Sequence, residues 1–399
     1  MSDDLKTIFD AYDRGKVTRR QLLYALGLGA GFAALPKPAT LLGQGQCGGA
    51  RAGTPECDTA PAKLPFEPTG WKTVRLNHFA IQAADYAKEA AYYAALMNWK
   101  VRSDDGKQAV LDIGDWGGAI IRGGYEAPPA PTPAPTPAPA AAPSAAAAQP
   151  PASGGAAGGG AAGGGAPGGG GGRGGPRTPR LVQIESFSFG IAPWDMKKVA
   201  GELKKRGINA TRLDDKNMPG FRIKDPGGWT LDITDGHVNP RANAANGKLN
   251  APPPFESTDW KTVWLDHISF EVPNYKESVA FYQALLGWSP TKDEGSQNQM
   301  EIGDVGDVIV RRGGGGRAGA TPAPPRPAGI GHIAYGIAPW DADKVKAELE
   351  KRGLTARIDT GGRGDIHTAT YQSYHTTTPN GFDLQISFST KENRSASIG

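Results

Sequence analysis

The residues of this chain that could do chemistry are its six histidines. Two of them, His78 and His267, end a repeated segment that reads WKTVRLNH in the first copy and WKTVWLDH in the second. His332 lies in a later alternating run, and His367 and His375 follow near the end of the chain. An imidazole can bind a divalent metal or carry a proton near neutral pH. A single histidine on a strand is usually a satisfied structural residue, but recurrence at one point of a repeated strand favours a functional site.

A second repeat shows which elements must position these residues. GIAPWDMKKVAGELKKRG at 190–207 returns as GIAPWDADKVKAELEKRG at 336–353, and each copy follows an alternating run that is typical of a strand. Beyond Pro193 and Pro339 the apolar residues take helical spacing, and basic residues precede a final glycine. Each copy therefore predicts a strand followed by a helix.

The spacing of the repeats indicates a duplicated two-part unit. The histidine segment recurs after 189 residues (78 to 267), whereas the strand-helix segment recurs after 146 (190 to 336). The difference of 43 residues is explained by a Pro/Ala/Gly-rich linker at 126–180. Helices are expected at 87–99 and 276–288, and final strands at 229–234 and 382–387, each after a Pro-x-Gly turn. We predict an α+β fold of four βαβββ modules in two pairs.

These patterns give the following domain boundaries. We expect a signal at 1–39, a tether at 40–64, module 1 at 65–125, a linker at 126–180, module 2 at 181–238, a linker at 239–253, module 3 at 254–312, a linker at 313–328, module 4 at 329–390 and a tail at 391–399. Module 2 pairs with module 1, and module 4 pairs with module 3.

Composition and the N-terminus bear on location and partners. The net charge is only +4 and the basic residues are scattered, so nothing favours nucleic acid. Arg19-Arg20 precede the apolar run 22–35, which resembles a twin-arginine signal and is short for a membrane span. We expect export to the periplasm or cell envelope, with no stable membrane span after processing. Cys47 and Cys57 could close a disulfide loop there or remain free.

Four segments together resemble the vicinal oxygen chelate superfamily, which includes glyoxalase I, extradiol dioxygenases and bleomycin-resistance proteins. They are LDHISFEV at 265–272, the helix end FYQALLGW at 281–288, GHIAY at 331–335 and TPNGFDLQ at 378–385. The resemblance covers all four modules and implies that each pair of modules forms a half-open barrel. It does not specify the reaction, because the superfamily hosts isomerases, dioxygenases, transferases and binders.

The resemblance also implies a metal site in the second pair. Carried over by position, its ligands are His267, His332 and Gln385. Two imidazoles and one oxygen donor leave open positions for a substrate on Fe²⁺, Mn²⁺, Zn²⁺ or Ni²⁺. Gln385 stands where the family usually has a glutamate, so the site would be less negative. Glu271, four residues beyond His267, could supply the missing charge.

The first pair offers His78, Ser186 and Asp232 at the corresponding positions. Serine is a poor neutral ligand for such an ion. We therefore expect the first pair to be structural or to bind weakly.

Candidate acid/base residues lie shortly before the last expected strand. His367 has the spacing of the acid/base histidine of extradiol dioxygenases, but Tyr374 comes one position early. Alternation then turns Tyr374 to the other face of its strand and His375 toward the site. His367 or His375 could hold a substrate oxyanion or pass a proton near neutral pH, and Tyr374 is a further catalytic candidate; the alternative is a solvated loop rich in Thr and His.

The sequence thus favours an exported, metal-dependent enzyme that acts on a small molecule with adjacent oxygens, with an extradiol-type dioxygenase preferred. A glyoxalase-type isomerase or lyase tolerates Gln385, although glutathione is mainly cytoplasmic. A non-catalytic binder of the resistance type is the third alternative.

Overall fold

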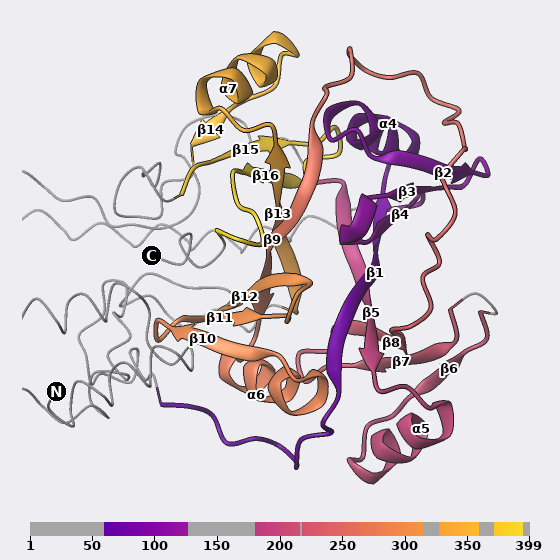
Figure 1. Ribbon diagram of the computed structural model, residues 1–399, viewed down its shortest axis with the longest axis vertical. Coiled ribbons are helices and arrows are strands. Elements are labelled where there is room, and N and C mark those ends of the chain that lie inside the picture. Colours follow the sequence, from indigo (N-terminus) through magenta and orange to yellow (C-terminus); the bar gives the residue numbers. More distant parts are fainter. Residues whose placement is uncertain (1–59, 127–179, 216–217, 314–326, 359–370, 394–399) are drawn as a thin grey trace, which may run out of the picture. The chain divides into compact units, whose positions relative to one another are not determined.

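The computed structural model describes residues 60–126, 180–215, 218–313, 327–358 and 371–393 (Figure 1). The expected signal, Cys47, Cys57, His367 and most of the linkers at 126–180 and 313–328 lie outside these ranges. Within them no helix is long and apolar enough to cross a membrane.

The first eight strands form one mixed sheet, called here the first domain. Its elements are β1 (Lys72–Ala83), α4 (Tyr86–Leu96), β2 (Lys100–Asp104), β3 (Gln108–Asp112), the short 3-10 helix η3 (Gly114–Trp116), β4 (Gly118–Arg122), β5 (Val182–Ala192), α5 (Met196–Lys205), β6 (Thr211–Leu213), β7 (Gly220–Lys224) and β8 (Thr230–Asp235). The strand order is β2-β3-β4-β1-β5-β8-β7-β6, so the first strands of the two modules meet at the centre.

The second domain repeats this plan. Its elements are β9 (Lys261–Val272), α6 (Tyr275–Leu286), β10 (Ser289–Asp293), β11 (Gln297–Glu301), β12 (Gly306–Arg312), β13 (Gly329–Ala338), α7 (Ala342–Lys351), β14 (Arg357–Ile358), β15 (Ser373–Thr377) and β16 (Asp383–Ser387). The order β10-β11-β12-β9-β13-β16-β15-β14 matches that of the first domain strand for strand. The predicted fold class of four βαβββ modules in two half-barrel domains is confirmed.

The helices begin and end where the sequence provides caps. Asp85, Asp195, Asn274 and Asp341 each accept a hydrogen bond from the backbone N–H three residues ahead. Gly207 and Gly353, the predicted stops, have φ of +69° and +71°, a conformation that other residues rarely adopt.

The two domains pack through contacts that are duplicated with the chain. The Trp99 indole N–H donates to the Thr262 hydroxyl at 3.0 Å, and the equivalent Trp288 donates to Thr73 at 2.9 Å. Phe187 lies edge-on to Phe270, with ring centroids 6.3 Å apart, so the apolar core is continuous between the sheets. The two domains therefore share one continuous core rather than having separate cores.

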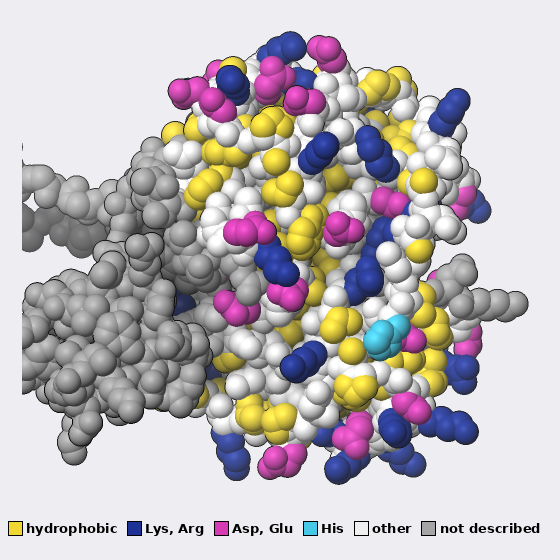
Figure 2. Space-filling view, viewed as in Figure 1, with side chains coloured by type: hydrophobic (Ala, Val, Ile, Leu, Met, Phe, Trp, Pro, Cys, Tyr) yellow, Lys and Arg dark blue, Asp and Glu magenta, His cyan; other side chains and the backbone are white. Residues whose placement is uncertain are grey.

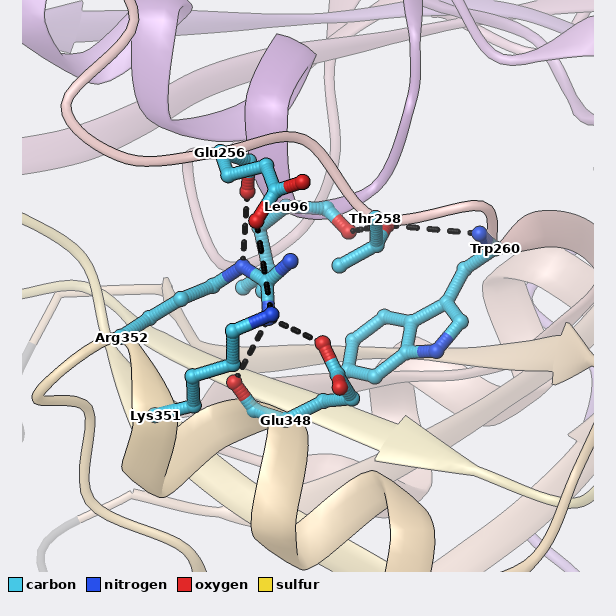
Figure 3. A network of polar contacts seen from close by, with 7 residues as sticks. All are labelled: Leu96, Glu256, Thr258, Trp260, Glu348, Lys351 and Arg352. Carbon is cyan, nitrogen blue, oxygen red and sulfur yellow. Dashed lines mark hydrogen bonds and ion pairs between the residues drawn. The ribbon is translucent and has the colours of Figure 1, made fainter.

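Figure 3 shows one such junction. Arg352, at the end of α7, donates to the Glu256 carbonyl oxygen and to Glu348, while the Thr258 hydroxyl donates to the Leu96 carbonyl of α4. In the first domain Arg206, the counterpart of Arg352, donates in the same way to the Glu67 carbonyl oxygen. On the face seen in Figure 2, acidic and basic side chains are interspersed over both domains.

Candidate metal centre

The candidate residues of the second domain lie side by side across its central strands. A row of register partners crosses four neighbouring strands of this sheet. His267 on β9 is opposite Ala334 on β13, and Ala334 is opposite Gln385 on β16. Gln385 is opposite His375 on β15. His332 is opposite Asp383, two residues from Gln385. Because cross-strand partners and residues two apart share one face, all five polar residues face the same side of the sheet.

Two imidazoles converge at the centre of this row. The Nε2 atoms of His267 and His332 lie 3.0 Å apart, with ring centroids 5.1 Å apart. Burial, and then the neighbouring His267 and His375, hold the pKa of His332 well below its usual value. His332 is therefore neutral at physiological pH and offers a nitrogen lone pair, which is the form that binds metals.

A third histidine and a carboxylate adjoin this pair. His375 is buried, its Nδ1 lies 2.9 Å from Oδ1 of Asp383, and its ring centroid lies 5.0 Å from that of His332. Ligand atoms of His332, His375 and Asp383 all lie within 4.8 Å of one another. Asp383 was not singled out from the sequence, although its place two residues before Gln385 puts it on the same face.

Gln385 is held by its amide nitrogen. This nitrogen donates to the Tyr371 hydroxyl at 2.7 Å and to the Ser373 hydroxyl at 2.9 Å. The Tyr371 hydroxyl donates in turn to Asp266 at 3.1 Å. The atom of Gln385 that would bind a metal is its carbonyl oxygen, and these contacts fix the amide group that carries it.

Asp266 links this chain of contacts to His267. Its Oδ1 lies 3.4 Å from Nδ1 of His267. Burial raises the pKa of Asp266, but His267 and hydrogen bonds from Ser387 and Ser389 outweigh it, so the pKa is lowered overall. An ionised Asp266 on Nδ1 orients the ring so that Nε2 faces His332, the role that carboxylates have behind metal-binding histidines.

The other predicted residues lie away from the centre of the row. Tyr374 is opposite Ile386 and lies on the other face of β15 from His375. Its ring stacks on that of Trp340, with ring centroids 6.4 Å apart. Glu271 lies further along β9, opposite Gly329. His367 lies outside the described residues, so its place relative to the row stays a prediction.

The same row of the first domain is built differently. His78 is opposite Ser188, which is opposite Asp232 and then Arg222. Arg222 binds both oxygens of Asp232, at 2.7 and 2.8 Å. Burial, and then Arg241, Arg122 and Arg222, lower the pKa of His78 to about 3. Ser186, the residue equivalent to His332, is opposite Ala80. A bidentate ion pair thus occupies the positions equivalent to His375 and Gln385.

Comparison with known proteins matches the second domain to a family. Residues 264–386 match the model of the Glyoxalase/Bleomycin resistance protein/Dioxygenase superfamily. No curated protein matches the chain.

Solved structures with a similar arrangement include two enzymes. One is the Mn(II)-bound glyoxalase from Novosphingobium aromaticivorans, with 14% identity over 79% of this chain and 82% of that chain and a TM-score of 0.48. The other is the 2,3-dioxygenase LapB from Pseudomonas sp. KL28, with 13% identity over 79% and 92% and a TM-score of 0.48. Likeness at this level does not identify a reaction.

Proposed function

Because residues 264–386 belong to the glyoxalase/bleomycin resistance/dioxygenase superfamily, we propose that the second domain is a metal-dependent enzyme for small molecules with two adjacent oxygens. The observation that carries this proposal is the approach of His267 and His332 to 3.0 Å between their Nε2 atoms. Two nitrogens that bind one metal at about 2.0–2.1 Å and at a right angle also lie about 3 Å apart. The residues present therefore fit a divalent ion.

The ligands in this proposal are His267, His332 and an oxygen donor from Asp383 or Gln385. The metal would hold the two substrate oxygens and polarise them. Asp266 keeps the His267 ring in place, as Asp383 does for Nδ1 of His375. With Nδ1 directed at Asp383, His375 would use Nε2 to take a proton from a substrate hydroxyl.

Ring cleavage by dioxygen is the reaction we favour, with Fe²⁺ or Mn²⁺ as the metal. Three histidines and a carboxylate on one face supply both ligands and a proton acceptor, which suits an acidic 1,2-diol on an aromatic ring. The neutral Gln385 favours the second candidate, an isomerase or lyase that needs no oxygen.

The experiment is to load the purified protein anaerobically with Fe²⁺, count the bound metal, add catechol as the probe and then admit oxygen. We expect one equivalent of metal and uptake of oxygen with the diol. His332→Ala should lose both, whereas His237→Ala, an exposed histidine outside the row, should lose neither. Metal retained in His332→Ala would refute the site, and bound catechol without oxygen uptake would favour the non-oxidative candidates.

We also propose export by the twin-arginine route, on the basis of Arg19-Arg20 before an apolar run. Replacement of both arginines by lysine should leave the protein in the cytoplasm. Fractionation that finds the variant outside the cytoplasm, as for the unaltered chain, would contradict this.

A further inference from the structure

The concave row of the first domain carries an unusual charge arrangement. Gly118 on β4 lies beside His78 on β1, since the next residues, Ala119 and Phe79, are register partners in a parallel pair. The row continues on both sides of this pair, with one residue on each strand. In order from β3 to β7 it consists of Asp112, Gly118, His78, Ser188, Asp232 and Arg222. His78 therefore lies in the middle of the row, with a carboxylate on either side.

Both of these carboxylates already have arginine partners. Arg102 binds the two oxygens of Asp112 at 2.9 and 2.5 Å, and Arg222 binds those of Asp232. Each pair has no net charge. Asp232 is therefore not left to balance a further cation in the row, whereas Asp112 also attracts Arg241.

Arg241 adds such a cation directly over the row. It comes from the segment between the domains, and its guanidinium donates to the Leu76 carbonyl at 3.3 Å. A Cβ on Gly118 would lie 3.1 Å from this guanidinium, so the absence of a side chain at Gly118 makes room for it. Within the described part of the chain Arg241 forms no ion pair with a carboxylate. Burial lowers its pKa only to about 10, so it stays charged at neutral pH.

Arg122 supplies a second cation on the same side. It lies four residues beyond Gly118 on β4 and so shares its face. The nearest carboxylate, Glu185, is 3.8 Å away, and both side chains are partly exposed (44% and 31%). Its Nε also donates to the Gln108 side-chain oxygen at 3.3 Å. Exposed contacts of this kind contribute little, so Arg122 can bind another anion in their place.

From these positions we infer that the first domain binds the anionic group of a small molecule, a carboxylate or a phosphate, between Arg241, Arg122 and His78. Guanidinium groups suit this class because they donate paired N–H groups to planar or tetrahedral oxyanions. The neutral imidazole of His78 can donate one further hydrogen bond. The inference does not depend on the metal site of the second domain.

The second domain has the opposite charge at the equivalent place. Asp307, which is buried, stands where the first domain has Gly118, and it is opposite Glu301, the counterpart of Asp112. At this position the first domain has the Arg241 guanidinium over Gly118, and the second has the Asp307 carboxylate. Other arginines are common to both domains, since Arg311 is the counterpart of Arg122 and Arg357 pairs with Asp383 at 3.0 Å. The contrast between Arg241 and Asp307 supports an anion rather than a second metal as the ligand of the first domain.

The test is calorimetric titration of the full chain with inorganic phosphate and, separately, with benzoate and succinate. We expect at least one probe to bind, and Arg241→Gln to weaken its binding about tenfold to a hundredfold, as for loss of a charge-assisted hydrogen bond. Arg122→Gln, at a more exposed position, should weaken it several-fold. Binding of phosphate alone or of carboxylates alone would identify the ligand group.

The matched control is Arg212→Gln on β6, whose exposed side chain pairs with Asp214 outside the row. It should bind the probes as the unaltered protein does. Circular dichroism and the metal content of the second domain verify that each variant is folded. The inference would be overturned if Arg241→Gln and Arg122→Gln both bound the probes as tightly as the unaltered chain does. It would also be overturned if no probe bound to the unaltered chain.

Discussion

The two domains share one backbone plan and differ at the few positions that face the concave side of each sheet. One histidine, at 78 and 267, is common to both. The other positions have diverged: the second domain has His332, His375, Asp383 and Gln385 where the first has Ser186, Arg222, Thr230 and Asp232.

This difference separates what makes the fold from what makes the site. Caps, stop glycines and the Trp–Thr contacts between domains occur in both copies, because each copy must fold and pack in the same way. The residues of the row are free of that requirement. A fold repeated almost unchanged can therefore have a cluster of histidines in one half and the Arg222–Asp232 ion pair at the equivalent positions of the other.

The largest effect is expected from transferring the metal site to the first domain. Replacing Ser186 and Arg222 by His, Thr230 by Asp and Asp232 by Gln reproduces the ligands beside the existing His78. We expect a second equivalent of metal, bound at least about a thousandfold more tightly than by the unaltered first domain, since two ligands and a charge are gained. Metal analysis under limiting chelator measures this. A stoichiometry that stays at one would show that the row alone does not define the site.

The oxygen donor can be identified next. We expect Asp383→Asn to weaken metal binding by about tenfold to a hundredfold, because the row loses the carboxylate that contacts His375. Gln385→Glu should tighten binding by restoring a charged donor at the family's usual position. Competition with a fluorescent chelator gives both constants. An unchanged constant in Asp383→Asn, together with loss in Gln385→Ala, would assign the oxygen to Gln385 alone.

In the first domain the corresponding change should affect stability instead of metal binding. Arg222→Met leaves Asp232, whose side chain is only 3% exposed, without its partner. We expect a loss of about 2 kcal/mol, below the 3–5 kcal/mol of a fully buried pair because Arg222 is half exposed. Urea unfolding measures this, and the double variant Arg222→Met/Asp232→Asn should recover most of the loss. A neutral single variant would mean that the ion pair is not structural.

The smallest effect concerns the junction between the domains, where the two copies place a buried carboxylate differently. Glu89 on α4 accepts from the Asn380 amide at 2.8 Å, whereas in the other copy Asp225 accepts from Tyr282 at 2.9 Å. Burial raises the pKa of Glu89 above its usual value of 4.5. The folded chain thus holds this proton more tightly than the unfolded chain does.

The stabilisation from this proton is full below the unfolded pKa and is lost as the pH rises through the folded pKa. We expect Glu89→Gln, which keeps an acceptor but cannot ionise, to lose less stability than the unaltered protein between pH 4.5 and 8. Thermal unfolding at several pH values checks this. Parallel pH profiles for the two proteins would contradict it.

The sequence predicted the fold well because the fold depends on local and repeated signals. Alternation, helical periodicity, caps and Pro-x-Gly turns are each visible within a dozen residues, and two different offsets located the long linker. The helix 276–288 was expected and α6 spans Tyr275–Leu286.

The site was less accessible because it depends on register between distant strands. Nothing near Asp383 in the sequence indicates that it would lie against His375, and Tyr371 was not recognised as the partner of both Gln385 and Asp266. The ion pair of Arg222 with Asp232 likewise joins residues on two strands whose pairing appears only in the folded sheet. Alternation along β16 and β15 was the available signal for the face, though not for the partners, since 383 and 385, and 373 and 375, share one face. Tyr371 lies before β15 begins, so alternation does not place it.

The central claim, that one half-barrel holds a metal and the other does not, is tested most directly by counting the metal bound per chain in two matched variants. His267→Ala and His78→Ala remove the same residue at equivalent positions of β9 and β1. Elemental analysis of the Fe²⁺-loaded proteins should give one equivalent for the unaltered chain, none for His267→Ala and one for His78→Ala. Equal loss in the two variants, or two equivalents in the unaltered chain, would contradict the division between the domains.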